Sequence, residues 1–193
     1  MGYFKRKQGD KMTEQYVPKE TLQDVLKYKC VGVPERGLTK ADAEFYEIRS
    51  ALSQKDGKTV EATYFPYYNK AGELTGFKKR DWTLPKDHDF HFTTVGTVKV
   101  NAQMFGQPQT QKGGRKLIIV EGEEEVPATR RAILDSLKGT KYEGKIEPSV
   151  VSISMGTANA AECVAHNLDF VQSFSDIVLA FDSDEATQKE LKK

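Results

Sequence analysis

Short, continuous runs of apolar residues mark the last third of the chain. They occupy residues 117–120, 150–153 and 177–181. Runs that are apolar without alternation are typical of parallel strands that are buried on both faces by packed helices. We expect those helices over the segments between the runs, residues 126–137 and 158–170. The pattern therefore predicts an α/β unit, a parallel sheet with flanking helices, over residues 113–193.

Residues 59–81 follow a different pattern, in which aromatic and β-branched side chains dominate the first half. The pattern predicts a strand over residues 62–68, a hairpin loop at 69–73 and a returning strand at 74–81. Successive side chains of a strand point to opposite faces, so Lys78 and Arg80 share one face. Lys79 and Asp81 share the other face. A small antiparallel sheet with a basic face is the expected result.

Two short helices are expected before this sheet. Apolar residues recur three and four positions apart in residues 19–26 and 41–48, and Thr39 can cap the second helix. The residues between them, 34–38, are typical of a turn. Helices and sheet together predict an α+β N-terminal unit over residues 19–112. Residues 1–18 are polar, lack periodicity and are interpreted as a flexible leader.

Composition narrows the class of protein. The chain has 193 residues, of which 38% are hydrophobic and 30% are charged, as in globular domains. Its two cysteines, Cys30 and Cys163, cannot form a disulfide framework or a cysteine-rich zinc site. No run approaches the roughly 20 apolar residues of a membrane helix, and the start lacks a signal peptide. We therefore expect a cytoplasmic protein without a membrane partner.

Charge is polarised along the chain although the formal net charge is only +1. The total does not indicate nucleic-acid binding by itself. Basic residues gather before position 90, namely Lys70, Lys78, Lys79, Arg80 and Lys86. Acidic residues gather after the apolar runs described above, so the distribution predicts a basic unit followed by an acidic one.

Carboxylates follow the predicted parallel strands at the edge where ligands of such sheets bind. Glu121 comes directly after the first strand, and Asp182 and Asp184 come directly after the last. The middle strand leads through Gly156 and Thr157 into a helix whose N-terminal amides can receive a phosphate. Such oxygen ligands select Mg²⁺ or Mn²⁺. The three carboxylates could thus form a site for phosphoryl or nucleotidyl transfer.

Glu123, Glu124 and the three histidines are not expected to take part in catalysis. Glu123 and Glu124 are expected to be the solvated, acidic first turn of a helix, where the helix dipole favours them. The three histidines lack serine or cysteine partners at recognisable spacing, which argues against a catalytic triad. The sequence also lacks the GxxxxGK[ST] phosphate-binding loop of ATPases.

Three motifs together resemble a known family. They are VEGEEE at residues 120–125, GTANA at 156–160 and FDSDEA at 181–186. They resemble the TOPRIM domain and, more narrowly, the primase half of bacteriophage primase-helicases. Upstream segments agree with this narrower resemblance, including YYN at 67–69, KKR at 78–80 and MFG at 104–106. The resemblance covers about residues 32–186.

The resemblance implies an RNA polymerase domain that makes short primers on a single-stranded DNA template from nucleoside triphosphates. Glu121 would be a metal ligand or the general base for the attacking 3′-hydroxyl. Asp182 and Asp184 would hold Mg²⁺ or Mn²⁺, with Glu125 as a secondary ligand. Template and nucleotide would contact the basic subdomain and the loop after the middle strand, through Lys78, Lys79, Arg80, Lys86, Gly156 and Thr157. Lys78, Lys79 and Arg80 could instead be ordinary solvated residues on the face of a strand, without a ligand.

The chain also departs from the family pattern. It lacks the cysteine-ligated zinc module and the helicase motifs, and Thr187 stands where the family usually has glycine. The acidic motif that follows Asp-x-Asp in the family would lie beyond Lys193. We therefore expect an incomplete TOPRIM sheet, as in a fragment, a split gene product or a subunit completed by another chain. A helicase domain or subunit is the expected partner.

Three functions are compatible with this pattern. The first is a primase core, a metal-dependent nucleotidyltransferase that makes RNA primers during phage-type DNA replication. The second is a non-catalytic module that binds DNA or assembles a replisome primase-helicase. The third is a TOPRIM nuclease, which would use the same acidic cluster to cleave DNA rather than to join nucleotides.

Overall fold

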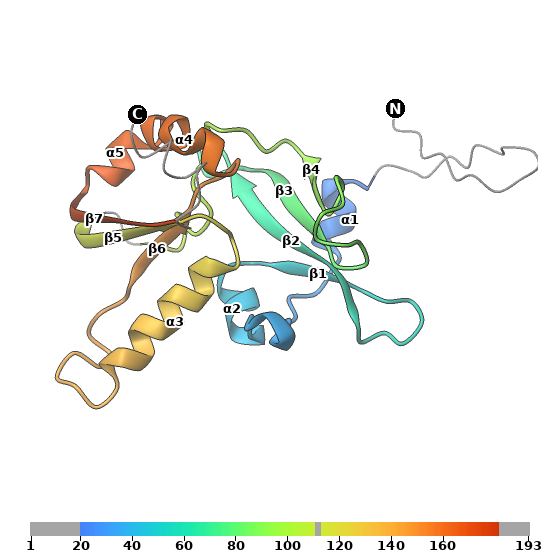
Figure 1. Ribbon diagram of the computed structural model, residues 1–193, viewed down its shortest axis with the longest axis horizontal. Coiled ribbons are helices and arrows are strands. Elements are labelled where there is room, and N and C mark those ends of the chain that lie inside the picture. The colour runs from blue at the N-terminus through green and yellow to red at the C-terminus, as the bar shows by residue number, and fades with distance from the viewer. Residues whose placement is uncertain (1–19, 111–112, 182–193) are drawn as a thin grey trace, which may run out of the picture.

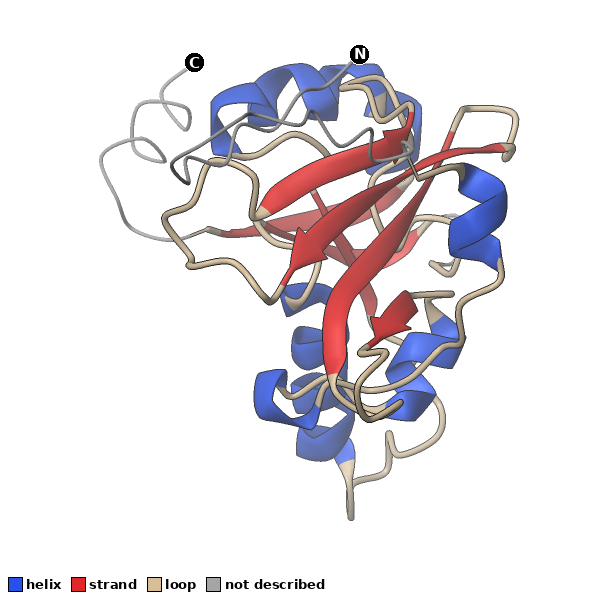
Figure 2. Ribbon diagram, turned by 90° about the vertical axis from the view of Figure 1, so that its right-hand side faces the viewer, coloured by secondary structure: helices blue, strands red, loops and turns tan. Residues whose placement is uncertain are grey.

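An antiparallel sheet followed by a parallel sheet forms the frame of the protein (Figure 1). The computed structural model describes residues 20–110 and 113–181. The interior is built from the strands of the two sheets, and the helices lie around them (Figure 2). Among the described residues, no helix is long and apolar enough to cross a membrane. This architecture is the predicted one, an α+β unit followed by an α/β unit.

The antiparallel sheet holds four strands in chain order: β1 (Arg49–Leu52), β2 (Val60–Tyr68), β3 (Leu74–Asp81) and β4 (Phe92–Gly96). The predicted hairpin is confirmed, since β2 pairs with β3 in antiparallel register. The turn between them depends on Asn69, whose side-chain oxygen accepts hydrogen bonds from the N–H groups of Ala71 and Glu73. Gly72 follows with a φ of 81°, a left-handed conformation that glycine adopts without strain.

Short helices flank this sheet: α1 (Leu22–Leu26), the 3₁₀ turn η1 (Pro34–Arg36) and α2 (Lys40–Phe45). The predicted cap is confirmed, because the Thr39 hydroxyl accepts a hydrogen bond from the Asp42 N–H group while the Asp42 carboxylate accepts one from the Thr39 N–H group. Thr21 and Asp24 form the same capping box on α1. The second helix ends earlier than predicted, and Glu47 beyond it has a φ of 56°.

The parallel sheet has β5 (Gly114–Val120) at its centre, between β6 (Ser149–Ser152) and β7 (Phe174–Ala180). The connections are α3 (Glu125–Leu137), then η2 (Thr157–Asn159), α4 (Ala160–His166) and α5 (Leu168–Val171). The single helix predicted over residues 158–170 is wrong. It is interrupted at Asn167, whose buried amide donates hydrogen bonds to the carbonyl oxygens of Ala102 and Cys163.

Burial differs between the two outer strands of the parallel sheet, β6 and β7. All four residues of β6 are buried, as predicted. The prediction is wrong for β7, where Ile177, Val178 and Leu179 are 41%, 38% and 46% exposed. Among the described residues β7 pairs with β5 alone, whereas β6 pairs with β5 and is also bridged to Phe105, so β6 is covered where β7 is not.

One hydrophobic core joins the two sheets. It includes Phe65 and Tyr67 of β2, Val120 of β5 and Val150 of β6, with Phe105 packed among them. Phe105 also exchanges two backbone hydrogen bonds with Ser152, so its segment adds to the edge of β6. The division of the chain at residue 112 remains a prediction, and the shared core shows that side chains from both sides of that position pack together.

Candidate active site

Glu121 lies at the carboxyl edge of the parallel sheet, directly after the last residue of β5. The preceding residue, Val120, is in register with Ser152 of β6 and with Ala180 of β7. The three strands therefore end side by side. Ligands of open parallel sheets bind at this edge, beyond the ends of the strands. Glu121 therefore lies at the end of a parallel strand, as the sequence predicts.

The two carboxylate oxygens of Glu121 have different surroundings. Oε1 accepts a short hydrogen bond from the hydroxyl of Thr157, which belongs to the loop after β6. Oε2 is buried and has no hydrogen-bond partner among the described residues. Buried polar atoms are almost always satisfied. An unpartnered carboxylate oxygen at this edge is therefore a position at which a cation or a proton donor fits.

The predicted metal ligands are only partly within the described residues. Asp182 and Asp184 lie outside them. Within residues 20–110 and 113–181, no three acidic, histidine or cysteine side chains come together as a metal centre. Glu125 accepts a hydrogen bond from the Glu121 N–H group at 3.2 Å. Carboxylate oxygens suit hard cations such as Mg²⁺, so Glu121 fits a divalent cation while the complete ligand set stays a prediction.

Glu123, in the loop after β5, is buried and only 3% exposed. Its Oε1 accepts hydrogen bonds from the Tyr67 hydroxyl at 2.5 Å and from the Lys78 ammonium group at 2.8 Å. The expectation of a solvated first-turn carboxylate is wrong, because side chains of the antiparallel sheet cover it. The alternation along β3 predicts that Lys78 and Arg80 share a face, but it does not indicate which carboxylate that face meets.

The three neighbouring cations of β3 all have carboxylate partners. Lys78 binds the buried carboxylate described above. Arg80 Nη1 lies 2.7 Å from Oε2 of Glu124, and the Arg80 guanidinium also stacks over nearby aromatic rings. On the opposite face, Lys79 Nζ lies 3.3 Å from Oε2 of Glu20. The predicted distribution over two faces is confirmed, and two of these ion pairs fasten the loop of Glu121 to the antiparallel sheet.

Burial sets the protonation of two groups in this contact. It raises the pKa of Glu124 above its ordinary value, although Arg80 and Arg36 lower that pKa by their positive charge. Burial, together with the charge of Glu123, also raises the pKa of the Tyr67 hydroxyl well above its ordinary value. Tyr67 therefore remains protonated and can donate its hydrogen bond over the whole physiological pH range.

The remaining predicted ligand-binding residues lie in loops. Gly156, after β6, has a φ of 75°, and a Cβ atom there would meet no other atom within 4 Å, so the space beside it is open. Its neighbour Thr157 is buried and donates to Glu121. Lys86 is exposed in the segment between β3 and β4. The structure brings Thr157 to Glu121 but does not bring Lys86 into the contacts of that carboxylate.

Comparison with known sequences finds a relative among phage proteins. No protein-family model matches the chain. The chain is 29% identical over 127 residues to the DNA helicase/primase of enterobacteria phage T3, in a match that covers 66% of this chain and 19% of the relative. It therefore spans about a fifth of the length of this curated relative.

Solved structures share the fold over most of the chain. The crystal structure of the primase fragment of the bacteriophage T7 primase-helicase protein matches with a TM-score of 0.66 and 23% identity, covering 94% of this chain and 67% of that one. In a second structure, primase domains of two gp4 subunits interact with the T7 lagging-strand DNA polymerase and are bound to an RNA/DNA hybrid and dTTP. It matches with a TM-score of 0.64 and 25% identity, covering 90% and 76% of the two chains. The chain has the architecture of a primase catalytic core and resembles the RNA polymerase domain of phage primases.

Proposed function

We propose that the chain is the catalytic core of a DNA primase, which makes short RNA primers on single-stranded DNA in a metal-dependent reaction during phage-type DNA replication. The observation that carries this proposal is the buried, unpartnered carboxylate oxygen of Glu121 at the carboxyl edge of the parallel sheet. The likeness to the T7 primase fragment supports it, because that fragment has the same fold.

Glu121 would hold Mg²⁺ or Mn²⁺ together with Asp182 and Asp184, with Glu125 as a further ligand. A divalent cation bound by these residues would neutralise charge on the triphosphate and promote ionisation of the attacking hydroxyl. The support for this ligand set is the single orphaned oxygen of Glu121 and the position of the two aspartates in the sequence, shortly after β7.

The proposed reaction is nucleotidyl transfer. The 3′-hydroxyl oxygen of the primer forms a bond to the α-phosphorus of the incoming nucleoside triphosphate, the bond to the bridging oxygen breaks, and pyrophosphate leaves while the hydroxyl proton passes to solvent. The part of this chain is to hold the reactants in place. Thr157 fixes the Glu121 side chain through Oε1 and leaves Oε2 for the ligand. The pair formed by Lys78 and Glu123 fixes the loop that carries Glu121.

Contacts to nucleotide and template are proposed from the sequence. Lys86, Gly156 and Thr157 are proposed to line the path of the incoming nucleotide. Lys78, Lys79 and Arg80 would contact nucleic acid only by exchanging a carboxylate partner for a phosphate. Their ion pairs therefore give them a positioning role in the free protein, in addition to the proposed binding role.

The partners we propose are single-stranded DNA, nucleoside triphosphates and a helicase domain or subunit. The named relative of phage T3 is a DNA helicase/primase, and the T7 primase domains are bound to an RNA/DNA hybrid and dTTP. These properties belong to those proteins. They support the same partners here because the likeness extends over most of the chain.

The direct test is de novo synthesis by the 193-residue chain. The four ribonucleoside triphosphates, one of them labelled, are incubated with single-stranded DNA and Mg²⁺ or Mn²⁺, with and without a chelator. We expect products a few nucleotides long that disappear with the chelator. DNA binding that is independent of metal, without any product, would instead identify a non-catalytic module. Shortening of labelled DNA in Mn²⁺ would identify a nuclease.

A further inference from the structure

A cavity of about 500 Å³ opens at the amino edge of the parallel sheet, where its strands begin. It lies between the start of β5, helix α3 and the segment that leads into β6, and is called the amino-edge cavity below. Glu121 lies beyond the other end of β5. With about 3.3 Å per residue, the seven residues of this strand separate its two ends by on the order of 20 Å. A ligand in the amino-edge cavity therefore leaves the carboxyl edge of the sheet open.

Aliphatic side chains line part of the amino-edge cavity. Ile118 of β5 and Ile133 of α3 are half-buried there, and Ile146, in the segment before β6, is 43% exposed. The apolar surface continues onto β7, because Ile118 is in register with Val178, which is 38% exposed. Residues in register on neighbouring strands share a face of the sheet. Exposed apolar surface that extends over several elements is typical of a binding site for another protein.

The polar part of the lining carries a positive charge. Its three cations are Arg115, Lys116 and Lys145. The two lysines form no ion pair among the residues that the structure describes, and Arg115 has only a distant partner, Asp176 at 3.7 Å, with both side chains largely exposed. The carboxylate of Glu147, which also lines the cavity, is already bound to Arg130 at 2.5 Å. The amino-edge cavity therefore offers free positive charge to an anionic ligand.

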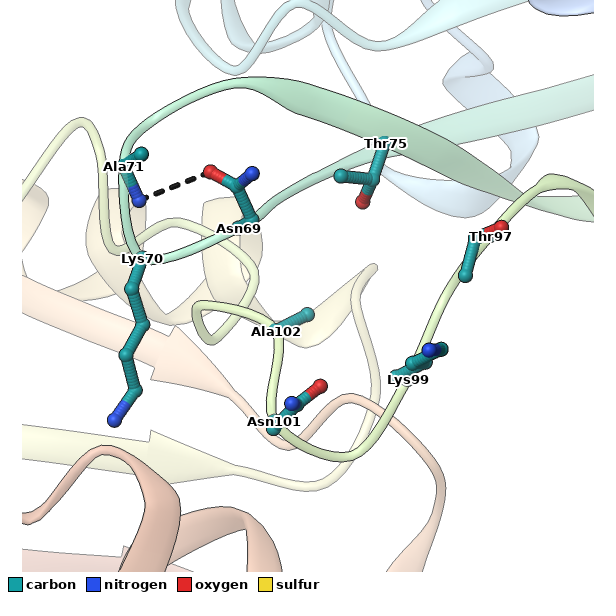
Figure 3. Close-up of a pocket in the computed structure, with 8 residues that line it drawn as sticks. All are labelled: Asn69, Lys70, Ala71, Thr75, Thr97, Lys99, Asn101 and Ala102. Atoms are coloured by element: carbon teal, nitrogen blue, oxygen red, sulfur yellow. Dashed lines mark hydrogen bonds between the residues drawn. The ribbon is translucent and has the colours of Figure 1, made fainter.

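A cavity between the tip of the β2–β3 hairpin and the segment after β4, shown in Figure 3, differs in its lining. This hairpin cavity also has two exposed lysines, Lys70 and Lys99, which form no ion pair within the described part of the chain. Its other lining residues are asparagines, threonines and alanines. The two cavities thus have similar charge, but the large aliphatic side chains belong to the amino-edge cavity. The hairpin cavity can serve as a control for the effect of charge alone.

Aliphatic side chains beside cations suit a peptide better than a nucleic acid. Sites for single nucleic-acid strands use aromatic side chains on which the bases stack, and the described residues that line the amino-edge cavity include no aromatic one. The core of a protein interface instead buries apolar side chains of both partners, and charges of opposite sign face one another around it. A segment with aliphatic side chains between carboxylates would match both properties of the cavity.

We propose that the amino-edge cavity is a docking site for an acidic, leucine-containing segment of a partner protein. Lys116 and Lys145, with Arg115, bind its carboxylates, and Ile146 contacts its aliphatic side chains. The proposal does not depend on primer synthesis, because the cavity lies at the opposite edge of the sheet from Glu121. Through this site the chain can hold another protein while the carboxyl edge of the sheet remains accessible.

The experiment measures binding of a labelled peptide, in which aspartates alternate with leucines, to the full chain by fluorescence anisotropy. We expect saturable binding that weakens as salt is added. Two control peptides of the same length carry asparagine in place of aspartate or serine in place of leucine, and each should bind about tenfold more weakly or less. Equal binding of either control peptide would overturn the proposal, as would a lack of binding by the aspartate–leucine peptide.

Charge variants locate the bound carboxylates. An exposed ion pair contributes about threefold to affinity, so Lys116→Gln/Lys145→Gln should weaken binding of the aspartate–leucine peptide about tenfold. The matched control, Lys70→Gln/Lys99→Gln, makes the same change in net charge at the hairpin cavity and should bind like the wild type. Equal weakening in the two variants would show unspecific attraction by charge and overturn the site.

An apolar variant locates the bound leucines. Ile146→Ala should weaken peptide binding about fivefold, because the contact area of the isoleucine is lost. Leu168→Ala, at a leucine of α5 that is 45% exposed, is the matched control and should bind normally. Both side chains are exposed in the free chain, so neither change should unfold it, as circular dichroism can verify. Normal binding by Ile146→Ala would contradict the proposed apolar contact.

Other occupants of the cavity would give different results. Single-stranded DNA that displaces the peptide, and that loses affinity in Lys116→Gln/Lys145→Gln, would identify a nucleic-acid site. A dimer in sedimentation experiments that dissociates in Ile146→Ala would identify a second copy of this chain. Either result would overturn the assignment to an acidic segment of a partner protein.

Primer synthesis separates this proposal from the proposed function. Lys116→Gln/Lys145→Gln and Ile146→Ala should make primers at the wild-type rate, because these residues lie away from Glu121. A loss of synthesis in these variants, with folding intact, would show that the cavity serves the reaction and would contradict the docking site. Specific peptide binding by a chain that makes no primer would support the docking site and overturn the primase proposal alone.

Discussion

The Glu123 carboxylate is buried against two donors from another part of the chain, Tyr67 and Lys78. A buried charge is tolerated only with a partner and with hydrogen bonds for its remaining lone pairs. This residue therefore couples the loop of Glu121 to strands β2 and β3 more strongly than any exposed ion pair could. The position of Glu121 therefore depends on a neighbour two residues away in the chain.

Removing Lys78 should destabilise the protein by leaving this carboxylate without its cation. We expect Lys78→Met to lower the free energy of unfolding by about 3 kcal/mol, at the lower end for buried pairs because the lysine side chain is 19% exposed. Lys79→Met, on the other face, should lose about 1 kcal/mol or less. Urea titrations measure both.

A double variant separates the effect of the unpaired Glu123 charge from the effect of losing the Lys78 side chain. The Lys78→Met/Glu123→Gln variant should recover part of the lost stability, because the amide removes the buried charge. The sum of the two single effects would then exceed the effect of the double variant. Strictly additive losses would show that the two side chains do not interact.

Glu124 should give the protein a distinctive pH dependence. Its pKa is raised from 4.5 by burial, so between 4.5 and the raised value the folded state binds more protons than the unfolded state. The free energy of unfolding contributed by this group therefore falls as pH rises through that window. The stability of the wild type relative to Glu124→Gln should decrease as the pH rises from 4.5 through the raised pKa.

Thermal unfolding of the two proteins across this range measures the difference. The exposed residue Glu44, whose side chain is 57% accessible, provides the control, and Glu44→Gln should follow the wild type. An increase of wild-type stability relative to Glu124→Gln with rising pH would mean that the attraction of Arg80 outweighs burial.

At the scale of the helices and strands, local sequence signals were sufficient where the contacts are local. The hairpin of β2 and β3 follows from aromatic and β-branched residues and from the loop at residues 69–73, and the cap of α2 follows from Thr39. The break at Asn167 was not predictable, because its amide binds Ala102, which is 65 residues away. The exposure of β7 likewise depends on what packs against the strand rather than on its own residues.

In the candidate site, too, the sequence does not predict contacts between residues that are far apart in the chain. Glu121 follows from its place after an apolar run. The role of Glu123 does not, because its donors Tyr67 and Lys78 are 56 and 45 residues away in the chain. A run of glutamates before a helix is typical of a solvated first turn. Only the packing of one sheet against the other changes that interpretation.

Helix α2 depends on its cap for more than its own stability. Asp42 is 4% exposed, closes the capping box with Thr39 and lies 3.3 Å from the Arg131 side chain of α3. We expect Thr39→Ala to lower the free energy of unfolding by about 1 kcal/mol, whereas Thr39→Ser keeps the hydroxyl and should lose much less. Chemical denaturation compares the two, and equal losses would contradict a role for the hydroxyl.

At the scale of the whole molecule, the antiparallel and parallel sheets share the core around Phe105. A common core predicts one cooperative unfolding transition rather than two. Phe105→Ala should lower the free energy of unfolding by about 3–5 kcal/mol. The matched control is Phe90→Ala, at a side chain that is 49% exposed, which should change stability by about 0.5 kcal/mol or less.

Two probes follow the transition. Trp82 lies just beyond β3 and reports on the antiparallel sheet by fluorescence, whereas far-ultraviolet circular dichroism reports on all elements. The two curves should coincide in the wild type and in Phe105→Ala. Separate transitions would show that the two sheets unfold independently despite their common core.

The central claim is that Glu121 serves a metal-dependent nucleotidyl transfer, and primer synthesis by Glu121→Gln tests it most directly. The amide keeps the shape of the side chain but removes the charge that would hold Mg²⁺ or Mn²⁺. Loss of several kcal/mol of transition-state stabilisation predicts a fall in synthesis of more than about a hundredfold, with folding intact by circular dichroism. Glu44→Gln should retain full synthesis. Unchanged synthesis by Glu121→Gln would contradict the account.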